Sequence, residues 1–203
     1  MAIEIEQIDN IRFDLGEGPM WHPREHVLYG VDVPNNLLWR LDPDTTEIRT
    51  WKTPSSVGSY GFREQGGLVM AMDRGFYFFD LDAGKATEIA KPAVDEQGTR
   101  FNDGKVDRRG GFVAGTMEHS LREPAGNLYS LRPDLSWARL DSGIICSNGP
   151  CWSPDGRTLY FADSIRYAIY AYDYDLDTGQ VANRRVFADT KAVGRGAPDG
   201  ATV

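Results

Sequence analysis

The chain has 203 residues, of which 41% are hydrophobic and 26% are charged, and its formal net charge is −8. This composition is ordinary for a soluble globular protein, and the length allows one substantial core. The negative charge disfavours nucleic acid as a partner, because binding to phosphates requires a basic surface that the sequence lacks. No apolar run approaches the ~20 residues of a membrane span, and residues 1–9 lack the features of a signal peptide. We therefore expect a cytoplasmic protein without a membrane partner.

A hairpin pattern with a polar residue at its entrance occurs near the N-terminus. Glu17 stands before a Gly-Pro pair, and a turn that contains Pro23 leads into residues 27–32, which are rich in β-forming side chains. The arrangement recurs most clearly at Asn148, which also precedes Gly-Pro and is followed by a strand at 158–162. This repetition predicts β-hairpins of one type along the chain.

Five copies of this pattern can be aligned at the position of the polar residue. In chain order the aligned residues are Glu17, Gly58, Asn102, Asn148 and Asp199. They are spaced by roughly 40 to 50 residues, a period that in an all-β sequence is typical of a β-propeller.

Each of the first four copies carries two further strand patterns, which brings the content to about four strands per repeat, as in a propeller blade. The second hairpin halves lie at 37–44, 75–82, 126–134 and 168–175. The outer strands are predicted at 48–51, 86–89, 136–140 and 185–187. No convincing long amphipathic helix is found.

We expect one incomplete all-β domain over residues 1–203. Its blades are predicted roughly at 14–54, 55–98, 99–143 and 144–196, and a further blade begins at 197–203. At about 45 residues per blade, the chain makes about four and a half blades. An unclosed propeller exposes strand edges, so the count predicts that the sequence is the N-terminal part of a longer protein. Whether it folds alone is left open.

Equivalent positions of the innermost strands converge on the central channel of a propeller. Glu17, Asn102, Asn148 and Asp199 would therefore gather there as two carboxylates and two carboxamides. A divalent cation would relieve the repulsion between the carboxylates, and oxygen ligands favour Ca²⁺, Mg²⁺ or Mn²⁺, with Zn²⁺ also open. The alternative is that each residue only serves its own turn. The recurrence of an oxygen-bearing side chain at the same position of four repeats favours the metal site.

We expect structural rather than catalytic roles for two other pairs of residues. Cys146 and Cys151 lack the further Cys or His partners of a zinc site, so we expect two small buried residues. Asp32 and Asp163 occupy matching strand ends, and we expect them to form hydrogen bonds between blades.

Several motifs together resemble the senescence-marker/gluconolactonase/luciferin-regenerating family, the regucalcin-like sugar lactonases. They lie at residues 15–21, 100–105, 115–117, 147–150 and 198–200. The resemblance covers the whole chain in the family's order. It implies a six-bladed propeller that is longer than this chain.

The resemblance also implies roles for individual residues. Glu17, Asn148 and Asp199 match the metal ligands, and Arg100 and Asn102 match the substrate-contacting pair. Asp103 and Glu118 are further candidates for substrate binding. Asp103 adjoins this pair and is also a typical turn residue. Glu118 lies close to the place where the family has an acidic residue that contacts the substrate, but Ser120 occupies the matched position.

The implied activity is metal-dependent hydrolysis of sugar lactones to aldonic acids in carbohydrate catabolism. Asp199 would act as ligand and general base. Two alternatives stay open, namely a non-catalytic calcium-binding or regulatory propeller, and hydrolysis of phosphotriesters or other esters at the same metal. We expect a small-molecule lactone as partner and a monomer or weak oligomer.

Overall fold

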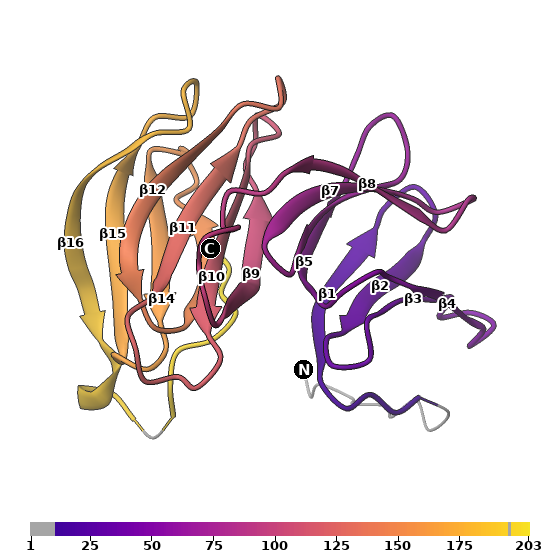
Figure 1. Cartoon of the computed structure of the whole chain (residues 1–203), viewed down its shortest axis with the longest axis horizontal. Helices are drawn as coiled ribbons and strands as arrows, with labels where there is room; N and C mark the ends of the chain where they lie inside the picture. The colour runs from indigo at the N-terminus through magenta and orange to yellow at the C-terminus, as the bar shows by residue number, and fades with distance from the viewer. Residues whose placement is uncertain (1–10, 195) are drawn as a thin grey trace, which may run out of the picture.

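The computed structural model describes residues 11–194 and 196–203, so the prediction about a signal peptide at residues 1–9 lies outside the described residues. The described chain forms four antiparallel sheets of four strands each (Figure 1). Within each sheet the strands follow one another in chain order. The expected all-β propeller architecture is confirmed, and the further blades that the resemblance implies stay a prediction.

The strand bounds show one regular repeat. The first sheet contains β1 (Gly16–His22), β2 (Val27–Asp32), β3 (Leu37–Leu41) and β4 (Ile48–Lys52). The second contains β5 (Val57–Phe62), β6 (Leu68–Met72), β7 (Gly75–Asp80) and β8 (Lys85–Ala90). The third contains β9 (Thr99–Val106), β10 (Phe112–Glu118), β11 (Gly126–Leu131) and β12 (Trp137–Ile144). The fourth contains β13 (Ser147–Trp152), β14 (Thr158–Asp163), β15 (Ala168–Tyr174) and β16 (Val181–Asp189).

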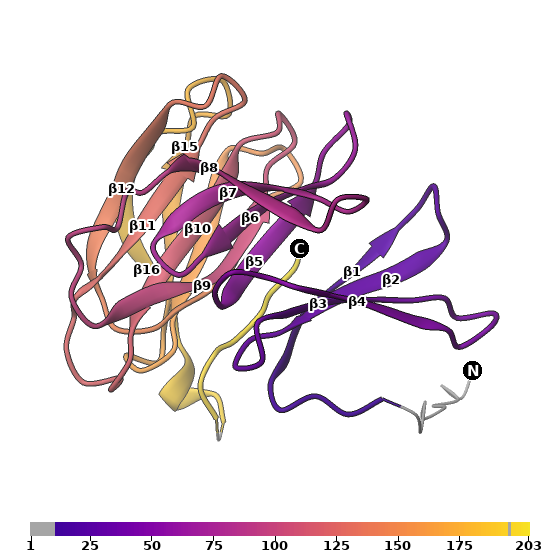
Figure 2. The same ribbon diagram turned by 45° about the vertical axis from the view of Figure 1, so that its right-hand side comes forward.

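Helical structure in the described part of the chain is limited to one short 3₁₀ helix, η1 (Thr190–Ala192). No helix among the described residues has the length and apolar character needed to cross a membrane. After η1 the chain turns back toward the middle of the molecule, where it ends (Figures 1 and 2). The Lys105 ammonium donates to the Ala201 carbonyl (2.8 Å), which ties this segment to β9.

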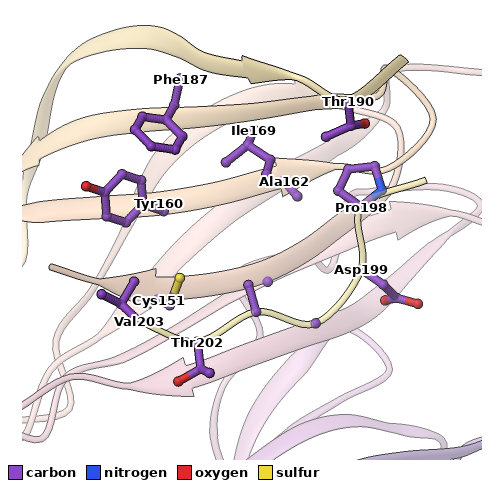
Figure 3. Close-up of a pocket in the computed structure, with 13 residues that line it drawn as sticks. Cys151, Tyr160, Ala162, Ile169, Phe187, Thr190, Pro198, Asp199, Thr202 and Val203 are labelled. Carbon is purple, nitrogen blue, oxygen red and sulfur yellow. The ribbon is translucent and has the colours of Figure 1, made fainter. Parts of the chain in front are cut away.

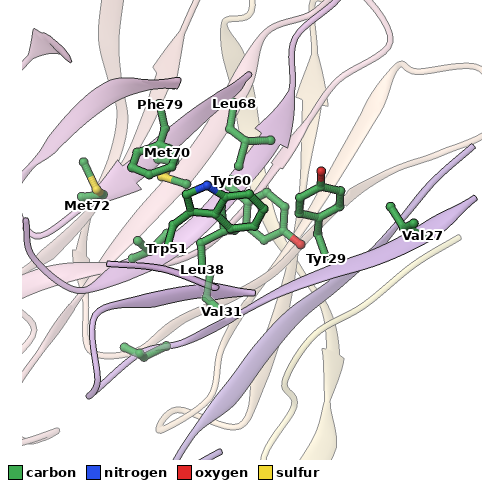
Figure 4. Packing of buried hydrophobic residues seen from close by; sticks show 12 residues of the cluster. Val27, Tyr29, Val31, Leu38, Trp51, Tyr60, Leu68, Met70, Met72 and Phe79 are labelled. Carbon is green, nitrogen blue, oxygen red and sulfur yellow. The ribbon is translucent and has the colours of Figure 1, made fainter. Parts of the chain in front are cut away.

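Neighbouring sheets pack face to face through alternating apolar side chains. Between the first two sheets, Tyr29, Leu38 and Trp51 meet Tyr60 and Met70 in one buried cluster (Figure 4). Similar clusters join the second sheet to the third and the third to the fourth. Burying a large apolar side chain stabilises the fold by roughly 1.5–3 kcal/mol, so these three layers hold the blades in place.

The innermost strands β1, β5, β9 and β13 lie against one another. Gly58 explains how β5 and β9 approach so closely. A Cβ atom added there would lie 2.5 Å from the Phe101 carbonyl oxygen, well inside van der Waals contact. The second repeat therefore has glycine where the other repeats have a polar residue, because no side chain fits against β9 at this point.

Asp32 and Asp163 both form structural hydrogen bonds, but not between blades as expected. Asp32 accepts the backbone N–H of Leu15 (3.2 Å), and Asp163 accepts that of Ile145 (3.0 Å). Each aspartate thus fixes the segment that enters the innermost strand of its own sheet. The prediction was wrong about the partners because the end of the second strand lies beside the start of the first in an antiparallel pair.

Candidate metal and substrate site

A small polar cavity lies where the innermost strands and the C-terminal segment meet. Its volume is about 140 Å³. The lining residues are Glu17, Gly18, Gly58, Asn102, Asp103, Met117, Cys146, Asn148 and Asp199. Every residue of the aligned repeat position, from Glu17 to Asp199, therefore borders one cavity, as the propeller geometry predicts.

Local irregularities in the strand pairing accompany these residues. The β1–β2 register shifts between Glu17 and Met20, and the β13–β14 register shifts between Asn148 and Cys151. The β5–β6 and β9–β10 registers also shift, beside Gly58 and at residues 102–103. A β-bulge re-aims the side chain at which it occurs. The Gly-Pro pairs after Glu17 and Asn148 supply the bulges, since Gly18 and Gly149 both have positive φ angles (58° and 56°).

Hydrogen bonds connect the predicted substrate pair to a predicted metal ligand. Nη1 of Arg100 donates to Oδ1 of Asn102 (3.0 Å) and to the Phe101 carbonyl (2.8 Å). Nδ2 of Asn102 donates to the Ser147 carbonyl (2.8 Å) and to Oδ1 of Asn148 (3.3 Å). Neighbouring blades thus hold Arg100, Asn102 and Asn148 in one connected arrangement.

Asp103 has a different role from its neighbours. Its carboxylate accepts the N–H groups of Gly104 (2.7 Å) and Gly149 (2.8 Å), which links β9 to the bulge that follows Asn148. Burial raises the pKa of Asp103, and these two backbone donors counteract that rise. Asp103 lines the cavity, but both of its oxygens are engaged with backbone groups.

Negative charge is concentrated around the cavity. Burial raises the pKa of Glu17, and the carboxylates of Asp199 and Asp103 raise it further, while Arg100 opposes the effect. Burial also lowers the pKa of Arg100. Bringing these carboxylates together costs free energy that a bound cation would recover.

The donor set fits a cation that prefers oxygen ligands. Asn148 is 7% exposed and Glu17 is half-buried, whereas Asp199 is exposed at the cavity. Within the described ranges, no three His, Cys, Asp or Glu side chains are close enough together to hold a metal ion. A site formed by Glu17, Asn148 and Asp199 therefore needs the Asn148 carboxamide oxygen as its third protein ligand. Three protein ligands leave further coordination positions of the cation for water and substrate.

Glu118 is not among the residues that line the cavity. Its carboxylate accepts the Ser120 hydroxyl (2.6 Å) and the backbone N–H groups of Ser120 (2.9 Å) and Arg122 (3.1 Å). These bonds close the loop after β10, and they lower the pKa of Glu118 to about 2, the Ser120 hydroxyl having the largest effect. The substrate contact expected of Glu118 stays a prediction.

Replacing Ser120 with Ala is expected to raise the pKa of Glu118 from about 2 toward its ordinary value of 4.5, because the largest stabiliser of the charged form is removed. A carboxyl ¹³C NMR titration measures this shift. Since the folded pKa is the lower one, the loop is stabilised above pH ~4.5 and loses that stabilisation as the pH falls toward 2. A pKa that stays near 2 in the variant would contradict this interpretation.

Glu118→Gln tests the predicted substrate contact. If Glu118 contacts the substrate, the KM of this variant should be higher than that of the wild-type protein.

Two side chains of the cavity are absent from the sequence-based prediction. Cys146 is 8% exposed, as expected for a buried thiol, but it also lines the cavity together with Met117. Nδ2 of Asn148 lies 3.7 Å from the Cys146 sulfur. Residues two apart share one face of an extended segment, so the spacing from Asn148 is the signal that could have identified Cys146.

A larger pocket of about 570 Å³ opens on the adjoining face of the fourth sheet (Figure 3). Tyr160, Ile169 and Phe187 form its wall, and residues 198–203 border it. The Asp199 carboxylate is directed away from Tyr160 and Phe187 (Figure 3). The smaller cavity has the greater concentration of carboxylate and carboxamide groups, whereas Asp199 is the one such group that borders the larger pocket among the described residues.

The SMP-30/Gluconolactonase/LRE-like family model matches residues 15–203. The chain belongs to this family. It is 35% identical to regucalcin of Xenopus laevis over 98% of its length and 68% of that protein. It is 34% identical to the 6-deoxy-6-sulfogluconolactonase of Pseudomonas putida over 92% of its length and 64% of that protein.

Solved structures of family members superpose closely. The calcium-binding protein regucalcin of Agrobacterium tumefaciens matches with a TM-score of 0.89 at 26% identity, over 96% of this chain and 65% of that one. A gluconolactonase of Xanthomonas campestris matches with a TM-score of 0.75 at 25% identity, over 93% and 66%. This chain therefore spans about two thirds of the length of its relatives.

Proposed function

We propose that this chain provides the metal and substrate site of a sugar-lactone hydrolase, which opens an aldonolactone to the aldonic acid. The observation that carries the proposal is that Glu17, Asn102, Asn148 and Asp199 border the same cavity. Arg100 is held beside it by its hydrogen bond to Asn102. The gluconolactonase and sulfogluconolactonase names of relatives support the choice of substrate class. In this proposal the enzyme acts on a small diffusing sugar in the cytoplasm as part of carbohydrate catabolism.

Glu17, Asn148 and Asp199 would hold one divalent cation. Carboxylate and carboxamide oxygens suit Ca²⁺, Mg²⁺ or Mn²⁺, and Zn²⁺ also accepts such ligands. When bound, the cation would supply Lewis acidity for the charge that develops on the lactone carbonyl oxygen.

The other chemistry belongs to side chains of this chain. Asp199, which is exposed at the cavity, would accept a proton from the attacking water. The water oxygen bonds to the carbonyl carbon, the ring C–O bond breaks, and the proton passes to the departing ring oxygen. Nη1 of Arg100 is committed to Asn102 and Phe101, so the rest of the guanidinium is the part that would bind sugar hydroxyls.

A calcium-binding propeller without catalysis is the second candidate. The description of the Agrobacterium relative as a calcium-binding protein favours it. A simple cation binder, however, does not need the Arg100–Asn102 pair beside its ligands, and this pair favours the hydrolase.

A pH-indicator assay on the full-length protein tests the proposal. After chelation, Ca²⁺, Mg²⁺, Mn²⁺ or Zn²⁺ is added back with a panel of aldonolactones. Metal-dependent release of acid is the expected result. If no lactone opens while calorimetry still detects cation binding, the calcium-binding alternative or a phosphotriester or other ester substrate replaces the proposal.

A further inference from the structure

A row of hydrogen bonds crosses the candidate site in one direction. It begins with the bonds from Arg100 to Asn102 (3.0 Å) and from Asn102 to Asn148 (3.3 Å). It continues as Nδ2 of Asn148 donates to the Ser164 hydroxyl (2.7 Å), which in turn donates to the Pro198 carbonyl (2.6 Å). The row thus connects β9, β13, the β14–β15 turn and the C-terminal segment.

The two ends of this row determine its direction. A guanidinium can only donate and a carbonyl oxygen can only accept. Every group between them must therefore accept on the Arg100 side and donate on the Pro198 side. This orientation aims Oδ1 of Asn148 toward Asn102, and it directs Nδ2 of Asn148 toward Ser164 and the Cys146 sulfur.

Of the four side chains in the row, Ser164 is the one that was not predicted as a site residue. It is 6% exposed, and its backbone N–H donates to the Cys146 carbonyl (3.0 Å), which holds the residue in place. Its hydroxyl contacts the side chain of Asn148 and the carbonyl of the residue before Asp199. One hydroxyl thus connects Asn148, a proposed metal ligand, to the backbone of the segment that carries Asp199.

We propose that Ser164 is a positioning residue that orients the Asn148 carboxamide oxygen and the Asp199 segment for one divalent cation. The inference rests on the proposed metal site. Partners of this kind, which hold the ligands themselves, typically change metal affinity 10- to 100-fold when they are removed.

Ser164→Ala in the full-length protein tests this role. We expect the Kd for Ca²⁺ and for Mn²⁺, measured by calorimetry, to rise at least tenfold, because both hydrogen bonds are lost. Ser164→Thr retains the hydroxyl and should restore most of the affinity. The matched control is Ser130→Ala, since Ser130 is 2% exposed and its hydroxyl has no hydrogen-bond partner within the described residues.

The melting temperature without metal separates positioning from a general loss of structure. Ser164→Ala should melt close to the Ser130→Ala control while binding the cation more weakly. A Kd within twofold of the wild-type value would overturn the role of Ser164, even if lactones are hydrolysed. If no lactone is opened but Ser164→Ala still weakens cation binding tenfold, the proposed activity fails and this inference stands. If the wild-type protein binds neither cation, both fail.

Discussion

Asp199→Asn is expected to reduce lactone turnover at least 1,000-fold, a loss of about 4 kcal/mol in transition-state stabilisation. The change keeps the shape of the side chain but removes the proposed general base and one charged ligand. Initial rates in the pH-indicator assay measure the loss, and calorimetry measures the accompanying rise in the metal Kd. Wild-type turnover in this variant would refute the assignment.

Glu17→Gln separates the two roles given to Asp199. Glu17 is a proposed ligand only, so its variant should bind the cation weakly and regain part of its activity at high metal concentration. Asp199→Asn should stay inactive when saturated with metal, because the proton acceptor is missing. Asp155→Asn is the matched control, since Asp155 is an exposed turn carboxylate whose partners are Ser153 and Arg157.

The repeat position was predictable from sequence because it depends on periodicity. Glu17, Asn102, Asn148 and Asp199 follow one spacing, and in a propeller one spacing means one channel. Gly58 fits the same rule, since the backbone of β9 fills the space that a side chain would need. The repeat period therefore indicates which residues lie together at the central channel.

Side-chain partners were less predictable, because they depend on reach and on loop conformation. Ser164 carries no repeat signal, yet its hydroxyl bonds to Asn148. Asp103 adjoins the substrate pair in sequence, but its carboxylate binds Gly104 and Gly149. Glu118 is held by the donors of its own short loop. No spacing rule distinguishes such local bonds from contacts with a substrate.

The largest stability effect is expected at Asp107, at the turn between β9 and β10. Its side chain is fully buried and accepts the N–H groups of Arg109 (2.7 Å) and Gly111 (2.8 Å). It also accepts the Tyr174 hydroxyl (2.6 Å) and pairs with the Arg132 guanidinium (3.1 Å). Because Tyr174 belongs to β15, this carboxylate joins the third sheet to the fourth.

Asp107→Ala should lower the free energy of unfolding by about 3–5 kcal/mol, because the mostly buried Arg132 guanidinium loses the carboxylate that neutralises it and is left with the carbonyls of Leu176 and Asp177. For a chain of this size that corresponds to a fall of roughly 6 to 20 °C in Tm. Urea unfolding and thermal melts measure the change. Asp177→Ala removes the exposed pair with Arg109 and should cost less than about 1 kcal/mol. If both variants lose equally little, the buried Asp107 carboxylate does not contribute more to stability than an exposed one, and the expected effect at Asp107 is refuted.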